Sequence, residues 1–315
     1  MQQVVFHYQA SPVLAKDLAA LAGEGIAVRA VPPDDRRALL AALQGAEALW
    51  HVLEPVTAEL IAAAPKLRLI QKIGVGVNTI DLGAARARGI AVCNMPGTNS
   101  RAVAEMTLGL MLACLRRLPQ LDAATRAGAG WQRPVDEMDR FGEIGGRTVG
   151  LVGYGAVPRL LAPVLAVMGA KVVHWSRSPR PDAVAESVTL KELLAASDIV
   201  SLHLPLVPET AKLIDERALA RMKPGSILVN TARGALIDQD ALVEALRGGH
   251  LRAAGLDVFA EEPLPRDHPL LALENVVLAP HLAWLTPETL ARSLAVAVEN
   301  CRRLRAGAPL LHRVA

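Results

Sequence analysis

The chain has 315 residues, of which 52% are hydrophobic and only 3% aromatic, and its formal net charge is +3. This length exceeds one ordinary core and suits two domains whose cores rely on aliphatic side chains. The small charge excess, without a run of five or six like charges, gives no indication of nucleic-acid binding. The longest apolar stretch, near residues 103–115, is interrupted by Glu105 and is shorter than the about 20 residues of a membrane span.

The cysteines and the first residues bear on the compartment. Cys93, Cys114 and Cys301 stand far apart and form neither a CxxC pair nor a zinc spacing, which favours free thiols in a reducing compartment. The first residues have no basic segment followed by an apolar run, so no secretory signal is expected. We therefore expect a cytoplasmic protein with no metal site, and neither a membrane nor a nucleic acid as partner.

Short aliphatic runs alternate with helical segments over the first third of the chain. Such alternation is typical of βαβ units and a parallel sheet. We expect strands at residues 4–6, 27–31, 48–52, 67–73 and 91–93, and helices at 10–22, 34–44, 56–64 and 82–88.

A long helix and a second βα series follow. Asn99 and Ser100 can cap a helix that begins near Arg101 and ends before Pro119. Residues 128–146 are irregular and suggest an arm or loop. Thr286 suits the N-cap of a closing helix, and Pro287 suits its first position. Strands of the second series are expected at residues 148–152, 171–175, 199–203, 226–230, 254–258 and 276–278, and the closing helix at 286–306.

A glycine-rich turn joins the first strand of that series to a helix, at residues 148–158 (TVGLVGYGAVP). Glycines there allow a tight turn and close backbone approach to a pyrophosphate, which the helix N-terminus attracts. Pro158 stands where the third glycine of the dinucleotide pattern is expected, and Pro163 predicts a kink in the helix. An ordinary tight βα turn remains the alternative reading of these residues.

The position that selects the cofactor's ribose falls at the end of the next strand, at residues 174–180 (HWSRSPR). A cofactor without a 2′-phosphate is usually held there by a carboxylate, and none is present. Arg177, with Ser176, Ser178 and Arg180, suits a 2′-phosphate instead. We therefore predict NADPH rather than NADH as the cofactor; solvated loop arginines are the alternative.

Three segments that follow predicted strands carry an arginine, a carboxylate and a histidine: residues 230–234 (NTARG), 257–263 (DVFAEEP) and 280–284 (PHLAW). In an open α/β sheet, ligands bind outside the carboxyl ends of the strands. Arg233 can clamp a substrate carboxylate and polarise a keto oxygen. His281 can donate a proton, and a paired glutamate would hold its orientation and favour its protonated form. Together these residues predict hydride transfer to a 2-oxo acid.

These motifs resemble those of the D-isomer-specific 2-hydroxyacid dehydrogenases, over most of the chain. The resemblance implies an α/β fold of two doubly wound parallel-sheet domains with a cleft between them. A flavodoxin-like substrate domain would comprise residues 1–98 and 287–315, and a Rossmann dinucleotide-binding domain residues 99–286. The long helix and arm, residues 99–146, would form a homodimer. The matching motifs lie at residues 72–81, 99–107, 153–155, 198–210, 222–225, 230–234, 257–263 and 280–281.

The resemblance also implies roles for individual residues. Arg233, Glu262 and His281 would be catalytic, with His281 as the acid/base. Substrate would be bound by the backbone at Val75 and Gly76 and by Arg233, His281 and Trp284. The nicotinamide cofactor would be bound by Thr107, Gly153, Tyr154, Gly155, Ala156, Val157, Ser176, Arg177, Ser178, His203, Leu204, Pro205, Thr210, Thr231, Ala232, Arg233, Asp257 and His281.

Departures from the family pattern sharpen the expected function. Met106 stands where the family often has histidine, and Trp284 after His281 resembles the glyoxylate/hydroxypyruvate reductases. We expect NADPH-dependent reduction of such a small 2-oxo acid to the D-2-hydroxy acid, with NADH as a possible cofactor. Two alternatives stay open: a catalytically weak cofactor-sensing protein, and a dehydrogenase of a phosphorylated hydroxy acid such as 3-phosphoglycerate. Only Lys72 and His51 are candidates to bind such a phosphate.

Overall fold

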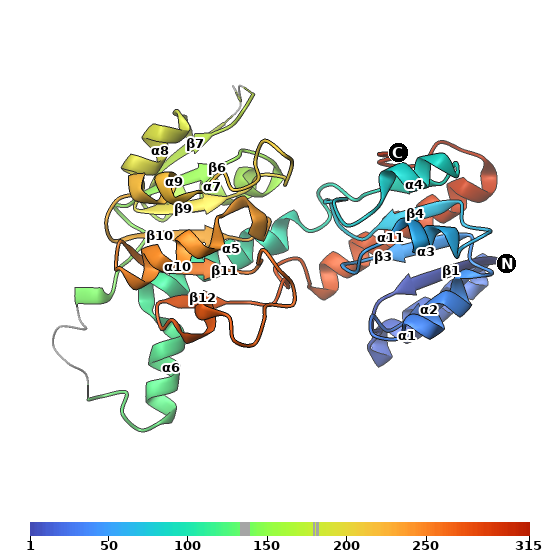
Figure 1. Cartoon of the computed structure of the whole chain (residues 1–315), viewed down its shortest axis with the longest axis horizontal. Helices are drawn as coiled ribbons and strands as arrows, with labels where there is room; N and C mark the ends of the chain where they lie inside the picture. The colour runs from blue at the N-terminus through green and yellow to red at the C-terminus, as the bar shows by residue number, and fades with distance from the viewer. Residues whose placement is uncertain (133–138, 179, 181–182) are drawn as a thin grey trace. The chain divides into compact units, whose positions relative to one another are not determined.

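The computed structural model describes residues 1–132, 139–178, 180 and 183–315. The chain forms two compact units, which we call unit 1 (Met1–Asn99 with Thr286–Ala315) and unit 2 (Ser100–Leu285). Each unit is built on its own parallel sheet (Figure 1). The fold class expected from the sequence, an α/β fold with two parallel sheets, is confirmed.

Unit 1 has a five-stranded parallel sheet in the order β2-β1-β3-β4-β5, which is the flavodoxin-like order. Its first four α-helices each begin after a residue whose side chain accepts a hydrogen bond from the first turn: Ser11, Asp35, Thr57 and Asp81. The strands are β1 Gln2–His7, β2 Ile26–Val31, β3 Ala48–His51, β4 Leu69–Lys72 and β5 Ala91–Cys93, and the helices are α1 Pro12–Ala20, η1 Leu21–Glu24, α2 Arg36–Leu43, α3 Ala58–Ala62 and α4 Leu82–Ala87.

The last part of the chain completes unit 1. Helix α11 (Pro287–Ala306) begins after the N-cap Thr286, as the sequence predicts. Inside the unit, the Asn300 side-chain amide donates to Gln71 Oε1 at 2.6 Å. The backbone amide of Val92 in β5 donates to the carbonyl of Ala315 at 3.0 Å. The core of unit 1 is therefore closed by residues from both ends of the sequence.

Unit 2 has a seven-stranded parallel sheet in the order β12-β11-β10-β9-β6-β7-β8. Counted from β6, this is the dinucleotide-binding order with a seventh strand added at the β12 edge. The strands are β6 Thr148–Val152, β7 Lys171–Trp175, β8 Glu186–Ser187, β9 Ile199–Leu202, β10 Ser226–Asn230, β11 Leu251–Leu256 and β12 Val276–Leu278, and the helices are α5 Ser100–Arg116, α6 Leu118–Arg126, α7 Ala156–Val167, α8 Leu190–Ala196, α9 Glu216–Arg221, η3 Gly234–Leu236, α10 Gln239–Arg247 and η4 Pro269–Ala272.

Two buried clusters cover the two faces of this sheet. Successive residues of a strand point to opposite faces, so Ile227 and Leu228 of β10 belong to different clusters. One cluster joins the strands to α5 and α7, and the other joins them to α8, α9 and α10. In the described part of the chain, no helix is long and apolar enough to cross a membrane.

The chain around Pro119 contains a helix that was not expected. The long helix α5 ends before Pro119, as the sequence predicts, at Arg116, and Arg117 takes a left-handed conformation with φ of 51°. A second helix, α6, then begins at Leu118 with Pro119 in its first turn. Proline is tolerated there because the N–H that it lacks would have no partner within the helix. Of the expected arm at 128–146, residues 133–138 lie outside the described part of the chain.

Two further differences are local. The short strand β8 was not expected, since two exposed residues leave no periodic pattern to detect. Helix α7 continues through Pro163, with Leu161, Ala162 and Leu165 buried around it. Proline removes a backbone hydrogen bond from the helix at that point. The packing of these three buried side chains stabilises the helix beyond it.

Candidate cofactor and catalytic site

The glycine turn lies where the strand order of unit 2 reverses, between β6 and β9. Gly153 has φ of 99°, and a Cβ there would lie 2.6 Å from the carbonyl oxygen of His203. No larger residue fits, so the ends of β6 and β9 approach closely only because position 153 is glycine. A switch point of this kind is where open α/β sheets bind ligands.

The N-terminus of α7 has the features of a pyrophosphate site. Gly155 is the N-cap residue of α7 and has no side chain that could accept a hydrogen bond from the first turn. A Cβ at Gly155 would meet nothing within 4 Å, so the space beside it is open. The amides of Ala156 and Val157, in the first turn, have no partner within the helix. Pro158 is buried at the third helical position. It therefore removes one potential donor of the turn but leaves the first two helical amides available for an anion.

The Tyr154 side chain packs against β7, next to this turn. The Tyr154 ring is buried and lies 4.3 Å, centroid to centroid, from the ring of His174 in β7. The Gly153 amide donates to the carbonyl of Trp175 at 2.7 Å. Tyr154 thus contributes packing rather than an exposed group.

The ribose-selecting loop follows β7. Arg177, Ser178 and Arg180 are exposed, and the Ser176 hydroxyl donates to the Ser178 carbonyl at 2.6 Å. Residues 179, 181 and 182 lie outside the described part. Among the described residues from Trp175 to Arg180, the charged side chains are those of Arg177 and Arg180.

The other predicted cofactor residues meet along the same sheet edge. Thr107 of α5 is buried and its hydroxyl lies 2.8 Å from that of Thr231, just after β10. His203, Leu204 and Pro205 follow β9. Burial lowers the pKa of His203 to about 3, so its imidazole is neutral, and Nε2 lies 2.9 Å from the Ser201 hydroxyl. Thr210 is buried, and its hydroxyl bonds to Pro205 and Val207 of its own loop.

Arg233 is held by the turn that follows β10. The Asn230 side chain donates to the Arg233 carbonyl at 2.8 Å and accepts from the Ala232 amide at 3.0 Å. The Arg233 guanidinium donates to the Ala232 carbonyl at 2.6 Å. Burial lowers the pKa of Arg233 and the nearby Glu262 carboxylate raises it, with burial the larger effect.

Glu262 and His281 form a direct pair. His281 Nδ1 lies 2.6 Å from Glu262 Oε2, and the other oxygen of Glu262 accepts from the Phe259 amide at 2.8 Å. Burial raises the pKa of Glu262. The hydrogen bonds from His281 and Phe259 and the charges of His281 and Arg233 outweigh that effect, so the net pKa is lowered. Glu262 is therefore an ionised partner that fixes the imidazole by Nδ1.

Asp257 fixes the backbone that carries His281. Its carboxylate accepts from the amides of Leu282 at 2.8 Å and Ala283 at 3.0 Å, and its carbonyl accepts from the His281 amide at 2.7 Å. Burial, the largest effect, raises the pKa of Asp257. His281 itself has φ of 58°, in the left-handed region. Such strain persists only where neighbours determine the backbone, and it gathers at functional sites.

Two of these segments of unit 2 pack directly against each other at Gly234. A Cβ on Gly234 would lie 1.8 Å from the carbonyl carbon of Phe259. The turn bearing Arg233 is thus packed directly on the segment bearing Glu262. With the glycine turn at the switch point, this is the arrangement of a dinucleotide-dependent enzyme.

The family model for the D-isomer specific 2-hydroxyacid dehydrogenase NAD binding domain matches residues 108–283. The chain belongs to the D-isomer-specific 2-hydroxyacid dehydrogenase family. The residues that this NAD binding domain model covers all lie in unit 2.

Several known proteins are similar to this one over most of its chain. A D-3-phosphoglycerate dehydrogenase of Mycobacterium bovis is 44% identical over 93% of this chain, but the match spans only 56% of that longer protein. A glyoxylate reductase of Aeropyrum pernix is 42% identical over 85% of this chain and 82% of its own. The crystal structure of the TT0316 protein from Thermus thermophilus has a TM-score of 0.90, with 40% identity and 99% of both chains covered.

The predicted substrate residues of the dehydrogenase are divided between the units. In unit 1, Val75 is 45% exposed, and the carbonyls of Gly74 and Val75 accept from Met95 at 2.8 Å and the Asn94 side chain at 2.9 Å. No backbone bond in the described residues uses the Val75 or Gly76 amide, which leaves both amides for an anion. In unit 2, Trp284 is 8% exposed, so most of its ring packs within the protein.

Sequence reasoning missed several residues that support the dehydrogenase site. Asp257 was expected to bind the cofactor; its carboxylate also accepts hydrogen bonds from the turn after His281, a contact that the sequence did not predict. Gly234 and Asn230 were noted only as part of a motif. A glycine directly after a strand-end arginine was the available signal, but the segment it contacts lies 25 residues further on and cannot be read from spacing.

Proposed function

We propose that this dehydrogenase reduces a small 2-oxo acid of the glyoxylate or hydroxypyruvate type to the D-2-hydroxy acid. The proposal rests above all on the Glu262–His281 pair, at 2.6 Å, with the charge of Arg233 acting on the same carboxylate. A proton donor, its carboxylate partner and a carboxylate-binding arginine are what reduction of a 2-oxo acid requires.

Each residue has a definite task in this proposal. When bound, the nicotinamide supplies the hydride. Arg233 binds the substrate carboxylate and polarises the keto oxygen. His281 presents Nε2 to that oxygen and donates the proton, since Nδ1 is committed to Glu262. We also assign the Val75 and Gly76 amides to the substrate carboxylate, as the family resemblance implies.

A phosphorylated substrate is the second candidate, because of the 44% identity to a D-3-phosphoglycerate dehydrogenase. The candidates to bind its phosphate, Lys72 and His51, are both buried, at 5% and 0% exposure. Lys72 Nζ donates to the Val52 carbonyl and lies 3.5 Å from His51 Nε2. Burial, with the charge of Lys72, lowers the pKa of His51 well below its usual value. A neutral histidine and an enclosed lysine favour the unphosphorylated substrate.

The experiment is oxidation of NADPH and NADH by the purified protein, with glyoxylate, hydroxypyruvate, pyruvate and a bulkier 2-oxo acid in parallel. We expect turnover that is fastest with the first two acids. Oxidation of 3-phosphoglycerate is measured beside it, and robust turnover of that compound would replace the proposal with the second candidate. Cofactor binding without turnover on any of these acids would favour a cofactor-sensing protein.

We further propose NADPH as the preferred cofactor, because Arg177 is exposed and the described residues 176–178 and 180, directly after β7, include no carboxylate. Replacing Arg177 with Gln is expected to lower kcat/KM for NADPH about tenfold, the cost of one charge-assisted contact. The value for NADH should stay unchanged. Equal effects on both cofactors, or an initial preference for NADH, would reject the assignment.

A homodimer is proposed through residues 99–146. In that segment Leu118 is 49% exposed and Trp131 is 83% exposed, and helix α6 buries no residue in the chain by itself. Large apolar side chains in such a segment favour a protein partner. Sedimentation of the wild type and of Trp131→Ser tests this, with Val13→Ser, 72% exposed in unit 1, as the matched control. A monomeric wild type would contradict it.

A further inference from the structure

Unit 2 has a pocket away from the residues that the proposed reaction uses. It has a volume of about 570 Å³ and is lined by the amino ends of β11 and β12, the end of α5 and the start of α6. Arg252, near the amino end of β11, lines it, whereas Asp257 follows the carboxyl end of the same strand. Since the strands are parallel, the pocket opens at the opposite edge of the sheet from Arg233, Glu262 and His281.

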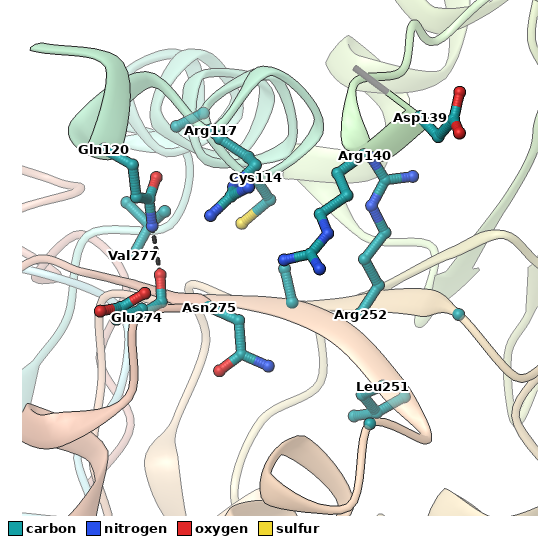
Figure 2. Close-up of a pocket in the computed structure, with 14 residues that line it drawn as sticks. Cys114, Arg117, Gln120, Asp139, Arg140, Leu251, Arg252, Glu274, Asn275 and Val277 are labelled. Atoms are coloured by element: carbon teal, nitrogen blue, oxygen red, sulfur yellow. Dashed lines mark hydrogen bonds between the residues drawn. The ribbon is translucent and has the colours of Figure 1, made fainter. Parts of the chain in front are cut away.

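The pocket is rich in guanidinium groups. Arg117, Arg140 and Arg252 all line it. Figure 2 shows the Arg117 and Arg140 side chains ending over its middle, whereas the carboxylates of Asp139 and Glu274 lie toward its two ends. Both carboxylates belong to exposed residues, where solvent screens their charge.

The surroundings of Arg252 favour the binding of an anion. Burial, the largest effect, lowers the pKa of its guanidinium, and the charges of Arg147 and Arg117 lower it further. One of its terminal nitrogens is buried and has no hydrogen-bond partner among the described residues. A half-buried cation set among other cations is costly unless an anion compensates it.

The pocket also offers a hydrogen-bond acceptor. The side chain of Gln120 in α6 donates through Nε2 to the Glu274 carbonyl, which orients the amide (Figure 2). Its other end, Oε1, is buried with no partner among the described residues. A ligand that satisfies the pocket therefore combines an anionic group for Arg252 with a hydroxyl for Gln120.

We propose that this pocket binds a small hydroxylated phosphate monoester. A phosphate dianion places two charges and several acceptor oxygens at one centre, which suits a pocket lined by three arginines better than a single carboxylate does. The volume exceeds that of a phosphate ion alone and lies in the range of small-molecule sites. Because the pocket is at the opposite sheet edge, binding leaves the cofactor site open.

The test is calorimetric titration of the intact protein, in its native oligomeric state, with glycerol 3-phosphate. The titration is run with and without saturating NADPH, which fills the nucleotide site and keeps phosphate from binding there. Inorganic phosphate, malate and glycerol serve as comparison ligands. We expect glycerol 3-phosphate to bind most tightly, with the same Kd in the presence of NADPH, and glycerol not to bind.

Arg252→Gln should weaken binding of glycerol 3-phosphate about tenfold or more, since it removes a charge-assisted hydrogen bond. Arg116→Gln is the matched control, because Arg116 is exposed, adjoins Arg117 and does not line the pocket. If Arg252→Gln fails to fold, Arg117→Gln serves in its place, and thermal unfolding verifies the fold of each variant.

Three outcomes would overturn the proposal. The first is no binding by the folded wild type, as when a second copy of the chain fills the pocket. The second is loss of binding on addition of NADPH, which places the phosphate at the nucleotide site. The third is an equal effect of Arg116→Gln and Arg252→Gln, or tighter binding of malate.

Discussion

His281 combines a chemical task with an unusual backbone. Its φ of 58° is costly for most residues, and asparagine tolerates this region best after glycine. His281→Asn therefore removes the proton donor while sparing the turn. We expect kcat to fall by about 10²–10⁴, the usual worth of a positioned acid, in a protein that still binds NADPH. His312→Asn, at a φ of 52° on the exposed C-terminal segment, is the matched control. Unchanged turnover of His281→Asn would refute its role.

Glu262 is ionised because its lowered pKa keeps the carboxylate charged at neutral pH. Glu262→Gln keeps the side-chain size and removes the charged acceptor that holds His281 Nδ1. Because a neutral hydrogen bond replaces a charge-assisted one, we expect kcat/KM for the 2-oxo acid to fall about tenfold. The measurement is kcat/KM of both proteins, with thermal unfolding to verify the fold of the variant. Equal values of kcat/KM in the two proteins would contradict a positioning role for Glu262.

The candidate catalytic residues could be proposed from the sequence because their residue types and their positions at the ends of strands are informative. Arg233, Glu262 and His281 each follow a buried aliphatic run, and parallel strands bring such ends together. The hydrogen bonds by which Asp257 and Thr210 hold their own turns could not be predicted in this way. Their hydroxyl and carboxylate oxygens bond to nearby backbone amides and carbonyls, and a sequence pattern does not distinguish a residue that holds a turn from one that contacts a ligand.

At the scale of elements, the packing of the 230–234 turn on the 257–263 segment sets the site. Gly234→Ala would place a methyl group against the Phe259 backbone, which has no flexible end to move away. We expect destabilisation of about 1–3 kcal/mol or more, as for other overpacked sites, together with reduced kcat. Gly45→Ala is the control, since a Cβ there meets nothing within 4 Å. Thermal unfolding and turnover are measured for both, and equal stability would contradict this account.

Helices and strands with a clear period were predicted to within a few residues, and the exceptions are instructive. Strand β7 and helix α11 each have a buried stripe and a clear start. Helix α6 buries nothing within the chain, so it has no apolar period to reveal it. Its start depends on Arg117 adopting a left-handed conformation, which cannot be predicted from the composition. Proline alone marks either the end of one helix or the first turn of another.

At the scale of the whole molecule, neutral buried histidines make the fold sensitive to acid. Burial lowers the pKa of His7, His51, His174 and His203, the last to about 3. Once unfolded, these imidazoles take up protons below about pH 6.5, while the folded protein does not. Stability is therefore retained above that pH and declines as the pH falls toward 3, by up to about 1.4 kcal/mol per pH unit for each proton.

Thermal unfolding at neutral and mildly acidic pH checks this expectation. The wild-type midpoint should fall on acidification, and His203→Asn should show a smaller fall in the transition that belongs to unit 2. His312→Asn, on the exposed C-terminal segment, should behave as the wild type does. A midpoint that does not depend on pH would show that these histidines are protonated in the folded state.

Unit 1 is closed by residues from both ends of the sequence, through Asn300 on Gln71 and Ala315 on β5. During synthesis the contiguous unit 2 can therefore fold as soon as it leaves the ribosome. The sheet of unit 1, translated first, waits for helix α11 before its last face is covered. A chain that stops early would keep a complete nucleotide domain beside an exposed apolar sheet, which is the kind of surface that chaperones and proteases bind.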